Sequence, residues 1–146
     1  MAETLKERIR HDLNEARKAR DREHTELLTT SLSEIRNREI EVGHDLSDDE
    51  VVGVLATAIK RRKEAAEQMH AGHRDELAQK EEREATALQA YMPAALTEED
   101  VRAMVRAAIA GGANNLGLVM REISPKIRGR FDGKAANAIV KTELGV

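Results

Sequence analysis

The sequence predicts an all-α protein, and three observations support that prediction. One Tyr, one Phe and no Trp occur among the 146 residues, whereas β-strands favour aromatic and β-branched side chains. Charged residues make up 35% of the chain, which is typical of helices with narrow apolar stripes and broad solvated faces. Apolar residues also recur at spacings of three and four, the period of one helix face. A chain of this length fits one domain or two very small ones.

Two helices are predicted before the first glycine. Leu5 begins an apolar stripe at spacings of four, four and three, which indicates a helix over about residues 3–20. A second stripe starts at Leu28 and reaches Val42, in a helix that we expect to end at Gly43.

A capping box predicts the start of the third helix. Ser47 stands three residues before Glu50, so its hydroxyl can accept the Glu50 backbone N–H while the glutamate reaches back to the cap. This helix is expected to end at Gly72. A fourth helix follows over about residues 74–91, and Pro93 stops it because the residue before a proline disfavours helical geometry. Short connections predict that these four helices are arranged antiparallel.

Three shorter helices are predicted after a linker at residues 92–96, and they make a small lobe. Their expected N-caps are, in chain order, Thr97, Asn114 or Asn115, and Asp132. Pro125 is expected to interrupt the middle helix, so that residues 125–128 form a separate turn. The inward positions expected for the last helix are Ala135, Ile139 and Leu144.

The balance of charge changes at this linker, where we place a boundary between domains at residues 1–92 and 93–146. The first part contains 16 Lys and Arg against 21 Asp and Glu, a net charge of −5. The second contains 8 against 6, a net charge of +2. The whole chain, at −3, does not have the charge of a generic polyanion binder, but its C-terminal part is basic.

Composition excludes several classes of site. The absence of cysteine excludes disulfides, thiolate nucleophiles, iron–sulfur clusters and cysteine-type zinc sites. The first ten residues do not have the apolar region of a signal peptide, and no window approaches the roughly 18 apolar residues of a membrane span. We therefore expect a cytoplasmic protein without a membrane partner.

Two groups of possible metal ligands have simpler structural interpretations. The acidic residues at 48–50 and 98–100 lie in first helical turns, where carboxylates favour the helix dipole. His70 and His73 are three residues apart, but Gly72 between them marks a helix end rather than a continuous helix face. We expect neither group to bind a metal ion, and the sequence indicates no cofactor.

The fourth predicted helix places two glutamates on the side that faces inward, beside apolar residues. Buried charges persist mainly when they are paired, so we expect an ion-pair network between this helix and the third. Its members are Arg62, Arg74, Glu81 and Glu84. The alternative is that the two glutamates act as general acid and base, which requires a cleft and a shifted pKa.

Basic residues gather between positions 121 and 141, together with glycines and the N-terminus of the last helix. These three features suit contacts with phosphate groups. The candidate nucleic-acid-binding residues are Lys126, Arg128, Gly129, Arg130, Gly133 and Lys134. The alternative is a solvated face, and the shortage of aromatic residues argues against stacking of single-stranded bases.

No self-contained catalytic centre is expected. The sequence contains no GxxxxGK[ST] phosphate loop, no GxSxG nucleophile elbow and no HExxH zinc motif. No residue pattern indicates an activated nucleophile.

Short motifs along the whole chain match a known family in their order and spacing. In the first part the matching stretches are residues 46–51, 59–62, 71–72, 74–78, 80–81 with Glu84, and 91–93. In the second part they are residues 117–120, 125–126, 129–133 and 139–141, with Asn137 and Leu144. Together they resemble the small stand-alone members of the GatB/YqeY family, with mild departures at His73 and Met92.

The resemblance implies that residues 93–146 form a lobe similar to the tail of the B subunit of tRNA-dependent amidotransferase. That enzyme amidates glutamate or aspartate on mischarged tRNA, and its tail contacts the tRNA. Its ATP-dependent chemistry lies in the catalytic core of the B subunit and its ammonia release in the amidase subunit, and this chain contains neither. The label of carbon–nitrogen ligase with glutamine as amide donor therefore attaches by resemblance only, and whether the chain is an enzyme stays open.

We expect an accessory protein whose basic lobe binds tRNA or another structured RNA. The alternative is a protein–protein adaptor, with the N-terminal helices docked on an amidotransferase or another large enzyme.

Overall fold

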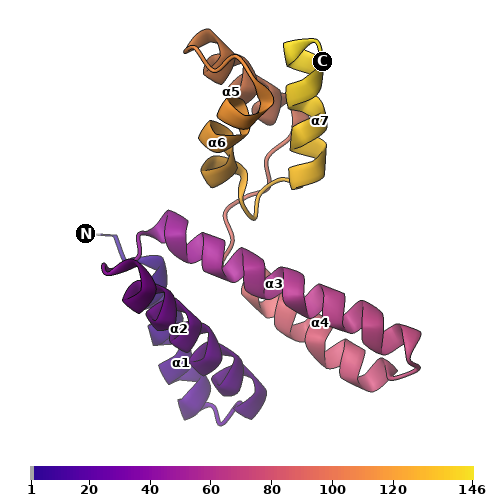
Figure 1. Ribbon diagram of the computed structural model, residues 1–146. Helices are drawn as coiled ribbons and strands as arrows, with labels where there is room; N and C mark the ends of the chain where they lie inside the picture. Colours follow the sequence, from indigo (N-terminus) through magenta and orange to yellow (C-terminus); the bar gives the residue numbers. More distant parts are fainter. Residues whose placement is uncertain (1) are drawn as a thin grey trace. The chain divides into compact units, whose positions relative to one another are not determined.

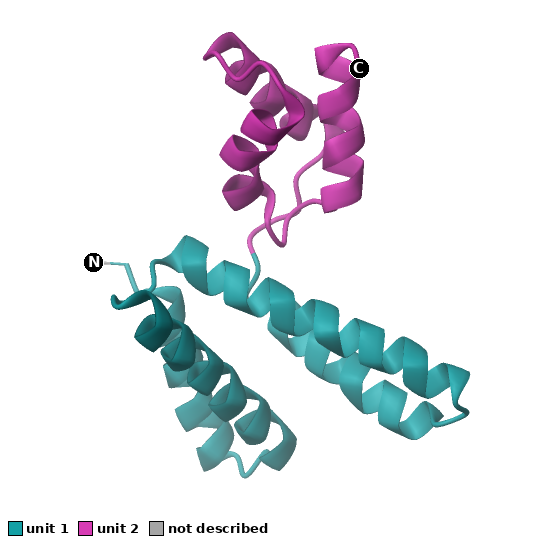
Figure 2. Cartoon of the chain, in the orientation of Figure 1, with its two compact units in different colours: residues 1–92 teal, residues 93–146 magenta. Residues whose placement is uncertain are grey.

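The computed structural model describes residues 2–146, and Figure 1 shows that they form α-helices, with no strand among them. The all-α prediction is confirmed. Within these residues the helices are α1 (Leu5–Lys18), α2 (Arg22–Val42), α3 (Asp48–Ala71), α4 (Asp75–Gln89), α5 (Glu98–Ala110), α6 (Leu116–Ile127) and α7 (Gly133–Leu144). The chain divides into two compact units, residues 1–92 and 93–146 (Figure 2). No helix in the described chain has the length and apolar character that a membrane span requires.

In unit 1, α1 and α2 form a first helical hairpin. The Thr4 hydroxyl accepts the Glu7 N–H and caps α1, and the Asp21 carboxylate caps α2 in the same way. The apolar stripe predicted for the first helix faces inward, with Ile9 and Leu13 buried.

The helices α3 and α4 form a second hairpin, whose outer half extends away from α1 and α2 (Figure 1). The predicted capping box opens α3: the Ser47 hydroxyl accepts the Glu50 N–H at 3.3 Å, and Glu50 accepts the Ser47 N–H at 3.1 Å. Near α1 and α2 the hairpin buries large residues such as Leu88, whereas farther out it buries Ala66 and Ala78. Polar contacts between α3 and α4 therefore contribute more to stability in the outer half than in the half near α1 and α2.

The core of unit 1 joins its four helices and includes Tyr91. The Tyr91 ring is buried, its hydroxyl donates to the Asp12 carboxylate, and the Arg8 guanidinium lies 4.9 Å from the ring centroid. Burial, together with the bond to Asp12, raises the pKa of Tyr91 well above its ordinary value. As the only tyrosine in the chain, Tyr91 also provides a spectroscopic probe of unit 1.

Unit 2 packs α5, α6 and α7 around an apolar core of its own, in which Val105 and Ile123 are buried. The N-caps of the three helices are Thr97, Asn115 and Asp132. Thr97 forms both halves of a capping box with Asp100, so aspartate completes the motif despite its shorter side chain.

The expectation that Pro125 interrupts the sixth helix is wrong. Pro125 lies inside α6, which continues to Ile127. The proline ring removes one N–H, and the acceptor that loses its partner is the Arg121 carbonyl. Because Arg121 is exposed and this is the last helical turn, water can bind the carbonyl in place of that N–H.

The inward face of α7 is shifted by one residue from the prediction. Ala135 is exposed, whereas Ala136 is fully buried. The buried stripe of the helix is Ala136, Ile139 and Val140. Spacings of three and four from Ala136 reach both large apolar residues, whereas the expected stripe left Val140 out.

Candidate nucleic-acid interface

The loop between α6 and α7 turns tightly at one end of unit 2. The N–H groups of Arg130 and Phe131 both donate to the Ile127 carbonyl, at 2.9 and 3.0 Å. Gly129 has φ +73°, in the left-handed region where a side chain is strained, so this turn favours glycine. The Leu96 N–H donates to the Arg130 carbonyl at 2.8 Å and thereby ties the segment before α5 to the loop.

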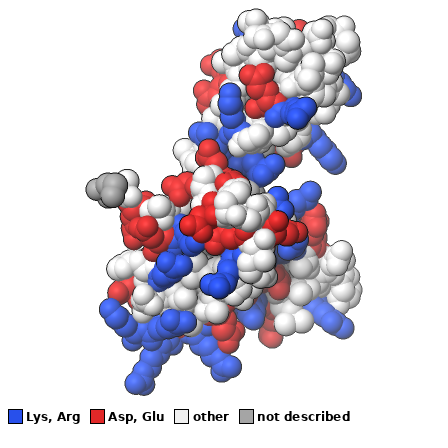
Figure 3. All heavy atoms as spheres, turned by 60° about the vertical axis from the view of Figure 1, so that its left-hand side comes forward, with Lys and Arg blue, Asp and Glu red and all other residues white. Residues whose placement is uncertain are grey.

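Four of the predicted cations flank this loop, and we call them the basic end of unit 2. They are Lys126, Arg128, Arg130 and Lys134. Within residues 2–146 none of them forms an ion pair; the ion pairs of unit 2 lie on other cations. Three are exposed, and the half-buried Arg130 donates through Nε to the Ala94 carbonyl at 3.0 Å. Figure 3 shows Lys and Arg side chains gathered at the lower end of unit 2, where the α6–α7 loop lies in Figure 1.

A negative charge already caps the N-terminus of α7. Asp132 Oδ2 accepts the Ala135 N–H at 2.9 Å. Within the described chain the N–H groups of Gly133 and Lys134 have no acceptor. Gly133 is outside the left-handed region, and a Cβ added there would meet no atom within 4 Å. A conformational reason for glycine therefore exists at Gly129 and not at Gly133.

Of the other four cations of unit 2, Arg102 and Arg106 form ion pairs within the unit, whereas Arg121 and Lys141 form none among residues 2–146. Arg106 Nε lies 3.1 Å from one oxygen of Glu143, and Arg102 Nε lies 3.2 Å from the other. The hydrogen bond from Arg106 lowers the pKa of Glu143 and raises that of Arg106. Arg121 and Lys141 are exposed, but Lys141 lies in the last turn of α7, at the opposite end of that helix from the basic end.

In unit 1 two of the four residues of the predicted network, Arg62 and Glu84, form an ion pair. Arg62 Nε donates to Glu84 Oε2 at 3.0 Å, and only 13% and 16% of the two side chains is exposed. Lys80 approaches the same carboxylate at 3.7 Å. Within residues 2–146 Arg74 and Glu81 form no ion pair; Arg74 is exposed in the turn of the second hairpin, and Glu81 is half-buried on α4. Of the four predicted residues, Arg62 and Glu84 therefore form the contact between α3 and α4.

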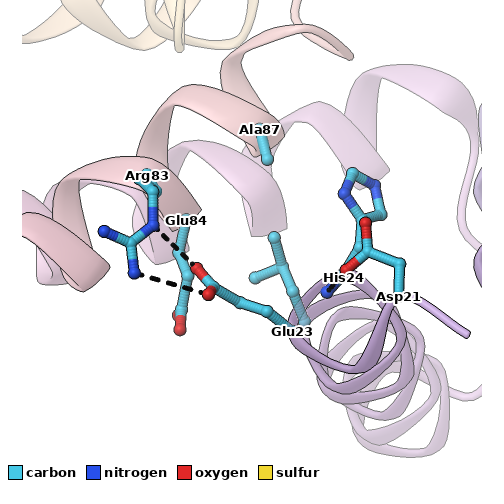
Figure 4. A pocket seen from close by; sticks show the side chains of 7 residues that line it. Asp21, Glu23, His24, Arg83, Glu84 and Ala87 are labelled. Atoms are coloured by element: carbon cyan, nitrogen blue, oxygen red, sulfur yellow. Dashed lines mark hydrogen bonds and ion pairs between the residues drawn. The ribbon is translucent and has the colours of Figure 1, made fainter.

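Glu84 also lines a hollow between α2 and α4 (Figure 4). Across this hollow Arg83 donates to both carboxylate oxygens of Glu23, at 3.1 and 3.4 Å, and so connects the two hairpins. On the other side, Asp21 accepts the His24 backbone N–H. With Glu84 bonded to Arg62 and Glu23 to Arg83, these contacts are those of a structural junction between α2 and α4.

His70 bridges two carboxylates near the turn of the second hairpin. Its Nδ1 lies 2.8 Å from Asp75 and its Nε2 lies 2.9 Å from Glu82. The hydrogen bond to Asp75, followed by that to Glu82, raises the pKa of His70. His73, three residues along the chain, has φ +59° and is exposed in the turn. Residues 2–146 include no cluster of three or more His, Asp or Glu side chains placed to hold a metal ion.

The fold and the site define a class: an all-helical protein of two units, the second of which presents unpaired cations around a tight glycine turn. The chain belongs to the family described as Yqey-like protein, whose model matches residues 6–144. The resemblance drawn from the short motifs is thereby confirmed. Comparison with curated proteins gives no match to the chain.

Proposed function

We propose that this protein is a non-catalytic accessory protein that binds tRNA or another structured RNA through the basic end of unit 2. In this proposal residues 1–92 are a four-helix scaffold, and residues 93–146 are a three-helix binding lobe similar to the tail of the amidotransferase B subunit. The protein would act in the cytoplasm, where tRNA is charged. The connection with amidation of tRNA rests on the family resemblance alone.

One observation supports the proposal: within the described residues, no acid forms an ion pair with any of the four cations of the basic end. Lys and Arg make most of the contacts through which proteins position nucleic-acid phosphates. Asp132 limits how such contacts form, because its carboxylate occupies the N-terminus of α7 and repels anions there. The side chains, rather than the helix N–H groups, would therefore carry the binding.

The kind of RNA follows from the shortage of aromatic side chains in unit 2. Phe131 is the only aromatic residue of unit 2, and it packs against the core of that unit. Stacking of unpaired bases requires exposed aromatic surfaces, whereas folded RNA is recognised through its shape and phosphates. We therefore favour a structured RNA over a single strand.

A gel-shift titration of the full chain with uncharged tRNA, repeated over a series of salt concentrations, tests the proposal. The variant Lys126→Glu/Arg128→Glu changes two exposed side chains that have no ion-pair partner within residues 2–146, so the helices are expected to remain folded. We expect the affinity for tRNA to fall about tenfold or more, and the slope of log K against log salt to fall by about two.

The matched control is Arg121→Glu/Lys141→Glu, which changes the net charge of unit 2 by the same amount. We expect it to lose much less affinity. Equal losses in the two variants would mean that net charge, and not the basic end, attracts RNA. If Lys126→Glu/Arg128→Glu binds tRNA like the unaltered protein, the proposal fails, and capture of a protein partner after nuclease treatment would favour the adaptor function.

A further inference from the structure

Unit 1 has a groove between α1 and α2 that combines an apolar floor with a positive rim. Its volume is about 260 Å³. The floor consists of Leu13, Leu32 and Ile35. The rim includes two arginines on facing helices, Arg10 on α1 and Arg36 on α2, with the hydroxyl-bearing Thr29 and Ser33 beside them. We call this feature the α1/α2 groove.

One end of the α1/α2 groove is electrically neutral. Lys6 Nζ donates to both oxygens of Glu39, at 3.0 and 2.8 Å, and Glu39 also accepts the Leu46 N–H at 3.0 Å. These bonds, that of Lys6 first, lower the pKa of Glu39, so its carboxylate stays ionised and compensates the charge of Lys6. Glu39 is the only acidic residue among those that line the groove.

The rest of the groove carries positive charge that the described chain offsets only in part, through Glu39, whose pKa the nearby charge of Arg36 also lowers. Arg10 and Arg36 form no ion pair and no side-chain hydrogen bond within residues 2–146. The Ser33 hydroxyl likewise has no partner in that part of the chain. Two guanidinium groups on the rim of one groove repel each other, and an anion bound between them would replace this repulsion with two attractions.

In two other hollows of this protein, the arginine that lines the hollow is paired with a carboxylate. In the hollow of Figure 4, Arg83 is bonded to Glu23. In a groove between α5 and α7, Arg102 is paired with Glu98 and with Glu143. In both places a carboxylate of the chain is bonded to the arginine, whereas within residues 2–146 no carboxylate is bonded to Arg10 or Arg36.

We infer that the α1/α2 groove binds a phosphate group. A guanidinium group presents two parallel donors that match two phosphate oxygens, and hydroxyl groups such as that of Ser33 add a neutral donor. The phosphate can belong to the backbone of an RNA or to a small phosphate compound. The inference goes beyond the proposed function, because it gives unit 1 an anion site of its own, and it deepens that function if the phosphate is part of the same RNA.

The first experiment titrates the full ¹⁵N-labelled chain with inorganic phosphate and follows backbone amide shifts by NMR. Sodium chloride at equal ionic strength corrects for general salt effects. Binding in the groove predicts saturable shifts at residues 6–13 and 29–36, which the variant Arg10→Gln/Arg36→Gln abolishes. The control Lys60→Gln/Arg61→Gln removes the same charge from exposed positions of α3 and should retain the shifts.

The second experiment measures tRNA affinity for the same two variants over a series of salt concentrations. A phosphodiester in the groove predicts that Arg10→Gln/Arg36→Gln lowers the affinity about tenfold and the salt slope by about two, while the control changes either by much less. The circular dichroism of both variants should equal that of the unaltered chain, because the changed side chains are exposed.

Saturable phosphate shifts that the groove variant abolishes support the inference with a small phosphate as ligand. A selective loss of tRNA affinity without such shifts supports it with RNA as ligand. The inference is overturned if the groove variant and its control behave alike in both experiments. Its failure is distinct from failure of the proposed function, since Lys126→Glu/Arg128→Glu tests the basic end of unit 2 without altering the groove.

Discussion

The α3/α4 hairpin and the basic end of unit 2 differ in whether their positive charges are paired with acids of the chain. In the hairpin, Arg62 forms an ion pair with Glu84, and His70 bonds to the carboxylates of Asp75 and Glu82. At the basic end, no acid within residues 2–146 forms an ion pair with the four cations, although the charge of Arg130 adds to the hydrogen bonds with Thr97 that lower the pKa of Asp100. A cation that the chain neutralises stabilises the fold, whereas one left unpaired stays available to a ligand. Substitutions in the hairpin should therefore lower stability and spare RNA binding, and those at the basic end should do the reverse.

The largest effect on stability is expected from Arg62→Ala. It leaves the mostly buried Glu84 with only Lys80, at 3.7 Å, so the free energy of unfolding of unit 1 should fall by about 2 kcal/mol. Urea unfolding followed by Tyr91 fluorescence measures this change in unit 1 alone, because unit 2 has no tyrosine.

The adjacent variant Arg61→Ala provides the control, since Arg61 is exposed and has no ion pair within the described chain. It should change the free energy of unfolding by less than about 0.5 kcal/mol. The double variant Arg62→Leu/Glu84→Leu should recover most of the loss, because the only charge then left without its partner is that of the half-exposed Lys80. Equal effects of Arg61→Ala and Arg62→Ala would show that the Arg62–Glu84 pair contributes nothing to stability.

Much of the fold could be predicted because its signals are local. The Ser47–Glu50 capping box and the Thr97 cap act within four residues, and both open helices where the sequence places them. The prediction that Pro125 interrupts its helix was wrong because the cost of a proline depends on its distance from the helix end. That end could not be located from the sequence. The face of α7 was misjudged because Ala135 and Ala136 are adjacent, and a helical stripe that contains Ile139 can begin at either of them.

The site could be predicted less well, because its contacts join distant residues. Glu82 lies twelve residues from His70 and meets it only because the hairpin turn sets the register of α4 against α3. The hydrogen bond from Arg130 to the Ala94 carbonyl spans 36 residues. The α1/α2 groove was missed for the same reason, since Arg10 and Arg36 come together only once the two helices pack. Sequence shows which residues carry charge, and packing decides which charges are neutralised.

A smaller effect on stability is expected at Gly129 and Gly133, which the sequence alone does not distinguish from each other. Gly129→Ala forces a side chain into the left-handed region and should lower the free energy of unfolding of unit 2 by about 1 kcal/mol. Gly133→Ala meets open space at a helix start and should change it by less than about 0.5 kcal/mol, toward greater stability. Urea unfolding of the full chain, followed through the NMR signals of α7, separates unit 2 from unit 1. A loss at Gly133 as large as that at Gly129 would contradict the assignment of the turn to Gly129.

The smallest effect is expected from His70→Gln, and it appears only as a dependence on pH. Because the pKa of His70 is raised above its unfolded value of 6.5, its stabilising contribution is fully present below pH 6.5 and is lost as pH rises through the folded pKa. The melting temperature of the unaltered chain should therefore exceed that of the variant at low pH, and the difference should shrink as pH increases. The exposed His11, which has no ion pair in the described chain, provides the control His11→Gln, expected to match the unaltered protein throughout. If the difference in melting temperature between His70→Gln and the unaltered chain is constant across the titration, the imidazole contributes packing and not charge. The Arg62–Glu84 pair would then be the contact in the hairpin whose charges stabilise the fold.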